Sequence, residues 1–204
     1  MQNMLASKLN YPLTATFRIV TLSPELQIKN ASGDVVLQIK QKLLTLREDT
    51  TAYQDVNKTI PLYRMKADRI SGFWAVHHFW RQQGEQYLGG IRANGLRSLW
   101  RINYTVLDAH QKEIFNIREE NAWIKFLDAV LCEIDFIGWI FGMFINPVYL
   151  VQDLSGRTLF RIKKKRSFWE RSFTMEADLK VPEEQQELAL LALAQSVLLE
   201  RARG

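Results

Sequence analysis

The sequence contains very little cysteine and histidine. Among its 204 residues, Cys132 is the one cysteine, and the three histidines are His77, His78 and His110. A single cysteine excludes an internal disulfide, and these four residues do not have zinc-finger spacing. Disulfide-stapled and zinc-finger folds are therefore excluded, no metal ligand is predicted, and a reducing, cytoplasmic environment is the default expectation.

Motifs of the common enzyme classes are also missing. The chain has no G-x-S-x-G elbow, no G-x-x-x-x-G-K-[ST] loop and no H-E-x-x-H helix. The glycine-containing stretch 89–95 lacks the Lys and the Ser or Thr that would hold phosphate and magnesium. No catalytic residue and no cofactor are predicted, and a catalytic group dispersed along the chain stays an open alternative.

Long uncharged segments are scarce. The start, MQNMLASKLNYPLTATF, has no continuous apolar stretch of the kind found in signal peptides. The run 136–145, FIGWIFGMFI, is uncharged, but Asp128, Glu133 and Asp135 lie in the 20-residue window that would be needed to span a bilayer. Central charges cost up to ~3 kcal/mol each, whereas good apolar residues return only ~0.5 kcal/mol each. This segment is therefore not predicted to be a membrane-spanning helix.

The composition is that of a folded domain with a mild basic bias. The chain is 47% hydrophobic and carries 27 basic against 22 acidic residues. This apolar content is ample for a core, and the length fits one domain. The charge is compatible with an anionic partner but does not identify one.

Three segments, 30–40, 108–118 and 153–163, follow one pattern. Each opens with Asn or Asp, has apolar residues at offsets six, seven and nine, and has a basic residue at offset ten. Asn and Asp cap turns through their side chains, and the glycine at offset three in two units supplies positive φ. Apolar and polar residues alternate before each turn. The pattern, with a weaker copy at 81–91, predicts repeated antiparallel hairpins.

The end of the chain is helical in character. Pro182 suits a first helical position, acids follow it, and Arg201 and Arg203 lie in the last turn. Residues 188–199 are apolar around nearly the whole circumference, which is typical of a helix enclosed on all sides. Twelve residues span only ~18 Å, too short for a ~30 Å hydrocarbon core, so protein is the predicted enclosure.

The three hairpin units, the run 159–178 (LFRIKKKRSFWERSFTMEAD) and the helix 183–203 together resemble the LURF-one-related family, over about residues 17–203. That family belongs to the tubby C-terminal-like superfamily, together with the phospholipid scramblases. The resemblance implies a mainly β fold, a closed antiparallel barrel of about twelve strands around a buried C-terminal helix. It also implies binding of anionic lipid head groups through basic side chains, and it carries over no active-site residue.

The expected organisation is one tubby-like barrel domain over residues 1–204. Within it, 1–12 is a candidate flexible start, 119–148 is an apolar departure from the repeat, and 182–203 is the central helix. Part of the departure, 123–134, has the spacing of a short amphipathic helix that would precede a buried strand.

A basic cluster follows the third hairpin. The residues that we predict to bind anionic lipid are Lys163, Lys164, Lys165, Arg166 and Arg171. Strict alternation would send Lys164 and Arg166 inward, so we expect the strand to end or bulge near Lys164. Alternatives are the ordinary solvated face of a strand and a nucleic-acid site, the latter disfavoured because the only aromatic residues here are adjacent.

Aromatic side chains provide a second candidate contact. The residues predicted to touch a membrane or a partner are Trp139, Phe141, Phe144, Phe168 and Trp169. The alternative for run 136–145 is that it belongs to the core. In strand 71–80, His77 and His78 would point to opposite faces and so could not share a metal. The outer aromatic face of that strand would contact a partner or lie beneath a loop.

The leading hypothesis is a non-enzymatic lipid-sensing or scaffold module, cytoplasmic and peripheral at an anionic membrane surface. Its predicted partners are anionic phospholipid or phosphoinositide, and a protein partner is the other possibility; nucleic acid is not favoured. The alternatives are a scramblase-like phospholipid mover that uses 136–145 as its membrane contact, and a soluble protein-interaction barrel with no lipid role.

Overall fold

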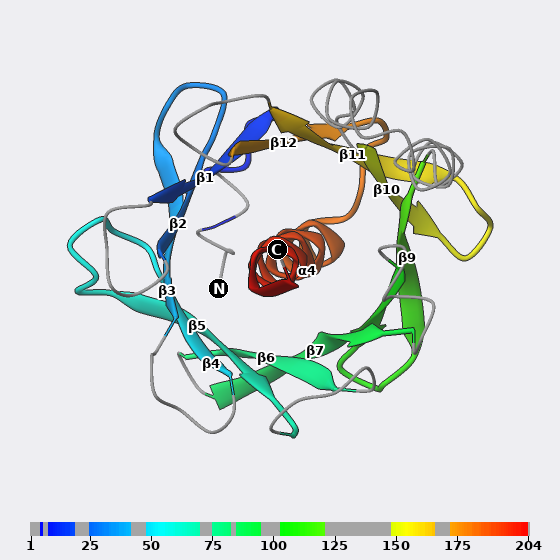
Figure 1. The fold of residues 1–204 in the computed structure, drawn as a ribbon, viewed down its shortest axis with the longest axis horizontal. Helices are drawn as coiled ribbons and strands as arrows, with labels where there is room; N and C mark the ends of the chain where they lie inside the picture. The colour runs from blue at the N-terminus through cyan, green and yellow to red at the C-terminus, as the bar shows by residue number, and fades with distance from the viewer. Residues whose placement is uncertain are drawn as a thin grey trace, which may run out of the picture.

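Twelve antiparallel strands form a closed barrel with a helix through its middle (Figure 1). The computed structural model describes residues 5, 8–18, 25–41, 48–69, 75–82, 85–94, 103–120, 148–165 and 172–203. The strands are β1 Leu13–Arg18, β2 Glu25–Lys29, β3 Val35–Gln41, β4 Asp49–Tyr53, β5 Pro61–Ala67, β6 Val76–Arg81, β7 Gln86–Ala93, β8 Asn103–Asp108, β9 Glu113–Glu119, β10 Val148–Asp153, β11 Thr158–Lys165 and β12 Ser172–Ala177. The helix is α4, Glu183–Arg203. The predicted fold is confirmed.

Each strand pairs with its neighbours in sequence, and the first strand closes the barrel against the last. Leu13 of β1 lies opposite Met175 of β12, and Thr16 lies opposite Ser172. Closure leaves no strand edge with unpaired backbone groups, which removes the usual route to edge-to-edge aggregation.

The inner face of the barrel and α4 bury each other. The strand residues predicted to face inward around the three hairpins are all buried: Leu26, Ile28, Leu37, Ile39, Tyr104, Val106, Phe115, Ile117, Tyr149, Val151, Phe160 and Ile162. On the helix, Leu190, Leu191 and Ala192 are fully buried, and residues on every side of this segment are also buried. The helix predicted to be enclosed on all sides is therefore enclosed by the barrel.

The three repeated units form the same turn. The side-chain oxygen of the opening Asn or Asp accepts hydrogen bonds from the N–H groups two and four residues later. Its carbonyl accepts the N–H three residues later, and that third residue has positive φ. These positive-φ residues are Gly33 (89°), Gln111 (62°) and Gly156 (81°). Turn chemistry thus explains why two of the units carry glycine there.

Gly89 and Gly90, at the start of the stretch 89–95, serve strand pairing. Gly89 has a φ of 141°, and a Cβ there would lie 2.1 Å from the carbonyl oxygen of Leu107 on β8. A Cβ at Gly90 would lie 2.8 Å from the carbonyl oxygen of His77 on β6. These two positions let β7 approach both of its neighbours closely.

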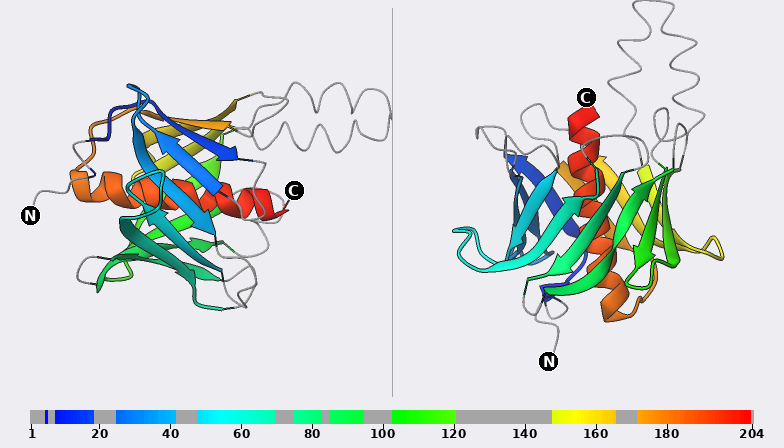
Figure 2. Two further views of the ribbon diagram at one scale, coloured as in Figure 1. Left: turned by 90° about the vertical axis from the view of Figure 1, so that its left-hand side faces the viewer. Right: turned by 90° about the horizontal axis from the view of Figure 1, so that it is seen from below.

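The barrel has two different ends. Among the fully described connections, the hairpin turns at 30–34, 54–60, 108–112 and 153–157 lie at the end where α4 begins, which we call the turn end (Figure 2). The helix passes through the barrel and ends at the opposite end. The strand connections at that opposite end, including 121–147 and 166–171, lie outside the described residues.

The start of the chain, the candidate flexible segment, packs against the barrel wherever it is described. Leu5 is buried in the core, and the Tyr11 ring lies 5.7 Å from that of Phe160. The backbone carbonyl of Asn10 accepts the N–H of Ala31, in the β2–β3 turn. Burial raises the pKa of Tyr11 to about 12.

A charge placed on the middle of α4 should unfold the protein. Leu191→Asp would bury a carboxylate among apolar side chains, at a cost of several kcal/mol out of a total stability of ~5–15 kcal/mol. We expect an insoluble or molten protein by circular dichroism. The matched control is Leu154→Asp on a turn, where Leu154 is 65% exposed and the melt should stay native. A native melt for Leu191→Asp would contradict the central position of the helix.

Two glycine substitutions should differ in cost for a structural reason. Gly33→Ala places a Cβ in open space, so only the left-handed backbone conformation destabilises the variant, by about 1 kcal/mol of unfolding free energy. In Gly89→Ala the positive φ is unfavourable and the new Cβ also collides with β8. The loss of unfolding free energy should therefore be several times larger than for Gly33→Ala. Urea unfolding of both variants measures the difference, and equal costs would argue against this register of β7 and β8.

Candidate functional site

The basic run lies on a regular strand, and its outward charges are partly neutralised. Lys163 Nζ lies 2.7 Å from Glu176 Oε2 on β12. Arg161 forms ion pairs with Asp178 at 2.8 Å and with Glu120 at 3.0 Å, and the pKa of Arg161 is raised, chiefly by its hydrogen bond to Asp178. Two of the outward cations are thus held by acids of the same wall.

The prediction that the strand ends near Lys164 is confirmed, because the last residue of β11 is Lys165, whereas the alternative of a bulge there is wrong. β11 continues to Lys165, and its pairing with β12 runs without a register shift from Phe160 opposite Ala177 to Lys165 opposite Ser172. Lys164 is half-buried and follows the inward alternation of Phe160 and Ile162. A lysine is tolerated there because a long side chain can bury its methylene stem and carry its ammonium toward the mouth of a barrel.

Lys165 is exposed at the end of β11, at the opposite end of the barrel from the turns. The structure therefore places Lys163, Lys164 and Lys165 in succession on one strand. The other predicted site residues lie outside the described residues: Arg166, Arg171, Trp139, Phe141, Phe144, Phe168 and Trp169. Their grouping with the three lysines stays a prediction.

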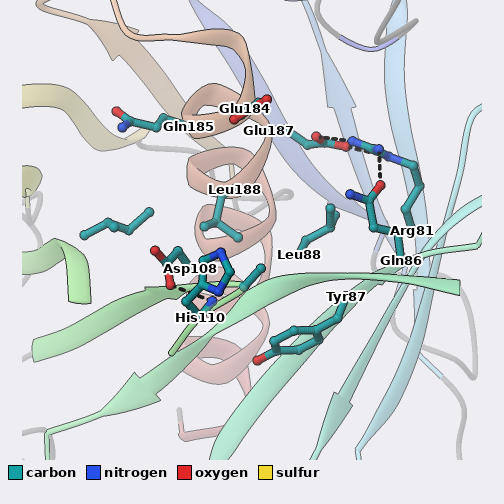
Figure 3. A pocket seen from close by; sticks show the side chains of 12 residues that line it. Arg81, Gln86, Tyr87, Leu88, Asp108, His110, Glu184, Gln185, Glu187 and Leu188 are labelled. Carbon is teal, nitrogen blue, oxygen red and sulfur yellow. Dashed lines mark hydrogen bonds and ion pairs between the residues drawn. The ribbon is translucent and has the colours of Figure 1, made fainter. Parts of the chain in front are cut away.

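A buried ionic cluster at the turn end was not predicted. Arg81 of β6 contacts Glu187 of α4 through two nitrogens, with Nη2 at 2.6 Å from Oε2 and Nε at 3.3 Å from Oε1 (Figure 3). The Tyr63 hydroxyl donates to Oε1 of the same carboxylate at 2.5 Å, and Arg81 Nη1 donates to Gln86 at 2.7 Å. The Glu187 side chain is only 4% exposed.

The electrostatics of this cluster follow from its geometry. The hydrogen bond to Glu187 raises the pKa of Arg81, against the effect of its partial burial. Burial, assisted by the neighbouring carboxylate, raises the pKa of Tyr63. Tyr63 therefore remains a neutral donor and Arg81 remains a cation. The cluster fixes α4 to β5 and β6 at one place along the barrel.

The sequence held a signal for this cluster. Glu187 is an acid directly before the apolar stretch 188–199, so an enclosed helix places it at the barrel wall. A buried carboxylate requires a charged partner. Arg81, at the inward-facing end of β6, is the matching cation, but choosing it requires the strand register.

The ionic cluster forms one side of a pocket of about 370 Å³ beside the start of α4 (Figure 3). Leu88, Ile114 and Leu188 provide its apolar surface, and Asp108 and His110 of the β8–β9 turn lie on the other side. The Asp108 carboxylate accepts two N–H groups of its own turn, and the Glu187 carboxylate is held by Arg81 and Tyr63. These two carboxylates of the pocket are thus already bound by groups of the protein itself.

The histidines are placed as expected. His77 faces inward, where its Nε2 lies 2.9 Å from Glu48 Oε2, an oxygen that also accepts from Gln195 of α4 at 3.3 Å. His78 faces outward, where its Nδ1 lies 2.9 Å from the Tyr87 hydroxyl. No group of three or more His, Cys, Asp or Glu residues that could hold a metal is found in the described part of the chain.

Comparisons with known proteins do not assign a family. A scan of family models, a search of curated proteins and a search of solved structures each found no match to this chain. Within the described residues, no helix combines the length and the apolar character needed to cross a bilayer. The resemblance to the LURF-one-related family stays a prediction.

Removal of Arg81 should be more costly than removal of the whole ion pair. Arg81→Leu leaves a nearly fully buried carboxylate without its cation, which typically costs about 3–5 kcal/mol. The double variant Arg81→Leu/Glu187→Leu removes that charge and should be more stable than Arg81→Leu alone. Urea unfolding measures both.

The exposed pair Lys163–Glu176 provides the control for this prediction. Its side chains are 47% and 41% exposed, so Lys163→Leu should change stability by less than about 1 kcal/mol. If the double variant is less stable than Arg81→Leu, then Glu187 is not the uncompensated charge that this geometry implies.

Proposed function

We propose that this protein is a non-enzymatic tubby-like barrel of the LURF-one-related type that binds an anionic membrane surface from the cytoplasm. The observation that carries the proposal is the basic run of β11, an unbroken strand that leads to an exposed Lys165 at one end of the barrel. A cation at a barrel end can meet a flat anionic surface without any change of fold.

The filled interior supports a function at the surface. The residues of α4 from Ala189 to Ala194 are at most 1% exposed, and they occupy the space in which a barrel of this size would otherwise hold a ligand. Binding then takes place on the outer wall or at the ends. Lipid head groups, which remain outside the protein, are compatible with such a molecule.

A soluble interaction barrel is the second candidate, and one observation favours it. Two of the positive charges of the run, those of Arg161 and Lys163, are each paired with acids on the same wall. Paired cations attract a membrane less than free ones, because the acid beside them is repelled by the same surface. The net attraction then depends on Lys165 and the residues that follow it.

The two lysines provide a matched test by liposome flotation. A cation near an anionic membrane contributes about 1 kcal/mol, so Lys165→Gln should weaken binding to phosphatidylserine vesicles about fivefold. Lys163→Gln should weaken binding less, because Lys163 lies two residues further from the barrel end than Lys165 and the attraction of a charged surface decays within a Debye length. Changing Lys163, Lys164, Lys165 and Arg166 together to Gln should abolish flotation, and thermal melts confirm that each variant is folded.

Salt and lipid composition complete this experiment. Binding of the wild-type protein should weaken steeply as salt is added and should be absent on neutral vesicles. If the wild-type protein does not float with anionic vesicles even at low salt, the lipid proposal fails and the interaction barrel takes its place.

A further inference from the structure

Three aromatic side chains form a cluster on the outer face of β6 and β7. The rings of His78, Trp80 and Tyr87 lie with each pair of centroids 5.7 Å apart and with interplanar angles of 46–56°. Tyr87 is fixed by its contact with His78 Nδ1 at 2.9 Å and by a hydrogen bond from Gln111. Burial lowers the pKa of His78, so the ring is mainly neutral at pH 7.

The core does not require this cluster. The inward positions of β6, His77 and Phe79, are the buried ones, whereas His78 and Trp80 are on the other face and remain half-buried. Large aromatic side chains grouped on an outer barrel wall are typical of a binding surface.

A hollow of about 310 Å³ adjoins Trp80. Strand register explains its other walls, because Arg64 of β5 lies directly opposite Trp80, and Lys66 lies opposite His78. Arg81, Gln82 and Glu85, from the end of β6 and the following turn, complete the lining. The volume is at the lower end of the range for small-molecule sites.

The three cations that line the hollow differ in the ion pairs that they already form within the protein. Arg64 donates from Nε at 3.1 Å and from Nη2 at 2.8 Å to Asp49, which braces the guanidinium and leaves its Nη1 available. Lys66 has no ion pair within the part of the chain that the structure describes. Arg81 is committed to Glu187, and Glu85 is the acid of the lining.

We infer that this hollow binds a small planar aromatic molecule that carries a phosphate, of the nucleoside monophosphate class. Its ring stacks on Trp80, which His78 and Tyr87 hold in place. Its phosphate is received by Lys66 and by the braced Arg64, since charge-assisted hydrogen bonds to phosphate are the strong ones. The site is separate from the proposed lipid surface, because β5 and β6 lie across the barrel from β11 (Figure 1).

Calorimetric titration with three probes tests both halves of the site. Adenosine monophosphate should bind, and adenosine and ribose 5-phosphate should each bind about tenfold more weakly, because each lacks one of the two contacts. Inositol phosphates form the fourth arm, since they carry phosphate without an aromatic ring. Tighter binding of an inositol phosphate than of the nucleotide would overturn the inference.

Variants assign the contacts. Lys66→Gln should weaken the nucleotide about tenfold and leave adenosine unchanged, whereas Trp80→Leu should weaken both and leave ribose 5-phosphate unchanged. Glu85→Gln should tighten binding of the nucleotide severalfold, because it removes the acid that lines the hollow beside the two cations. Lys163→Gln, the same change of charge on β11, should have no effect.

The result is independent of the membrane proposal. Lys66→Gln should float with anionic vesicles as the wild-type protein does, so one proposal can fail while the other stands. No binding of the nucleotide at millimolar concentration would overturn the inference, as would binding that neither Lys66→Gln nor Trp80→Leu weakens in variants with native melts.

Discussion

Enclosure of α4 is the constraint on which the rest of this structure depends. The helix is apolar around nearly its whole circumference between Leu188 and Leu198, so only a surface that surrounds it can remove it from water. A closed barrel provides such a surface and also removes the strand edges that an open sheet would expose. The inward apolar side chains of the wall form one core with the helix, and the outward positions remain available for function. The cluster of Arg81, Tyr63 and Glu187 adds a polar contact at one end, which sets where along the barrel the helix begins.

This arrangement restricts where ligands can bind. Since α4 fills the interior, ligands can bind only on the outer wall or at the two ends of the barrel. One proposed site lies at an end and the other lies on the wall. The basic run of β11 leads to one end, and the aromatic cluster of β6 and β7 lies on the wall. In both places arginines are braced by acids, Arg161 by Asp178 and Arg64 by Asp49. A braced arginine is pre-organised for an anion but contributes little net charge, so Lys165 at the first site and Lys66 at the second carry most of the attraction.

Much of the fold could be predicted from local chemistry. Asn30, Asp108 and Asp153 identify their turns because the side-chain oxygen itself makes the turn's hydrogen bonds. Alternation then gives the inward residues, and the apolar circumference gives the enclosed helix. The buried cluster could not be derived in the same way, because pairing Glu187 with Arg81 depends on a register between residues far apart in sequence. The strand end near Lys164 was predicted, but the bulge was not needed, because a lysine that alternation sends inward close to a barrel mouth can carry its ammonium outward on a long side chain. The outer cluster of His78, Trp80 and Tyr87 joins two strands, and only β6 showed its aromatic character in the sequence.

Native-state hydrogen exchange of the amides of residues 190–194 tests the enclosure of α4 most directly. If the barrel must open for this helix to meet water, these amides exchange only through global unfolding, with the same free energy that urea unfolding gives. The account predicts this equality. Exchange of the same amides at a free energy several kcal/mol below the global value, while the strand amides remain protected, would show that the helix leaves an intact barrel and would contradict the account.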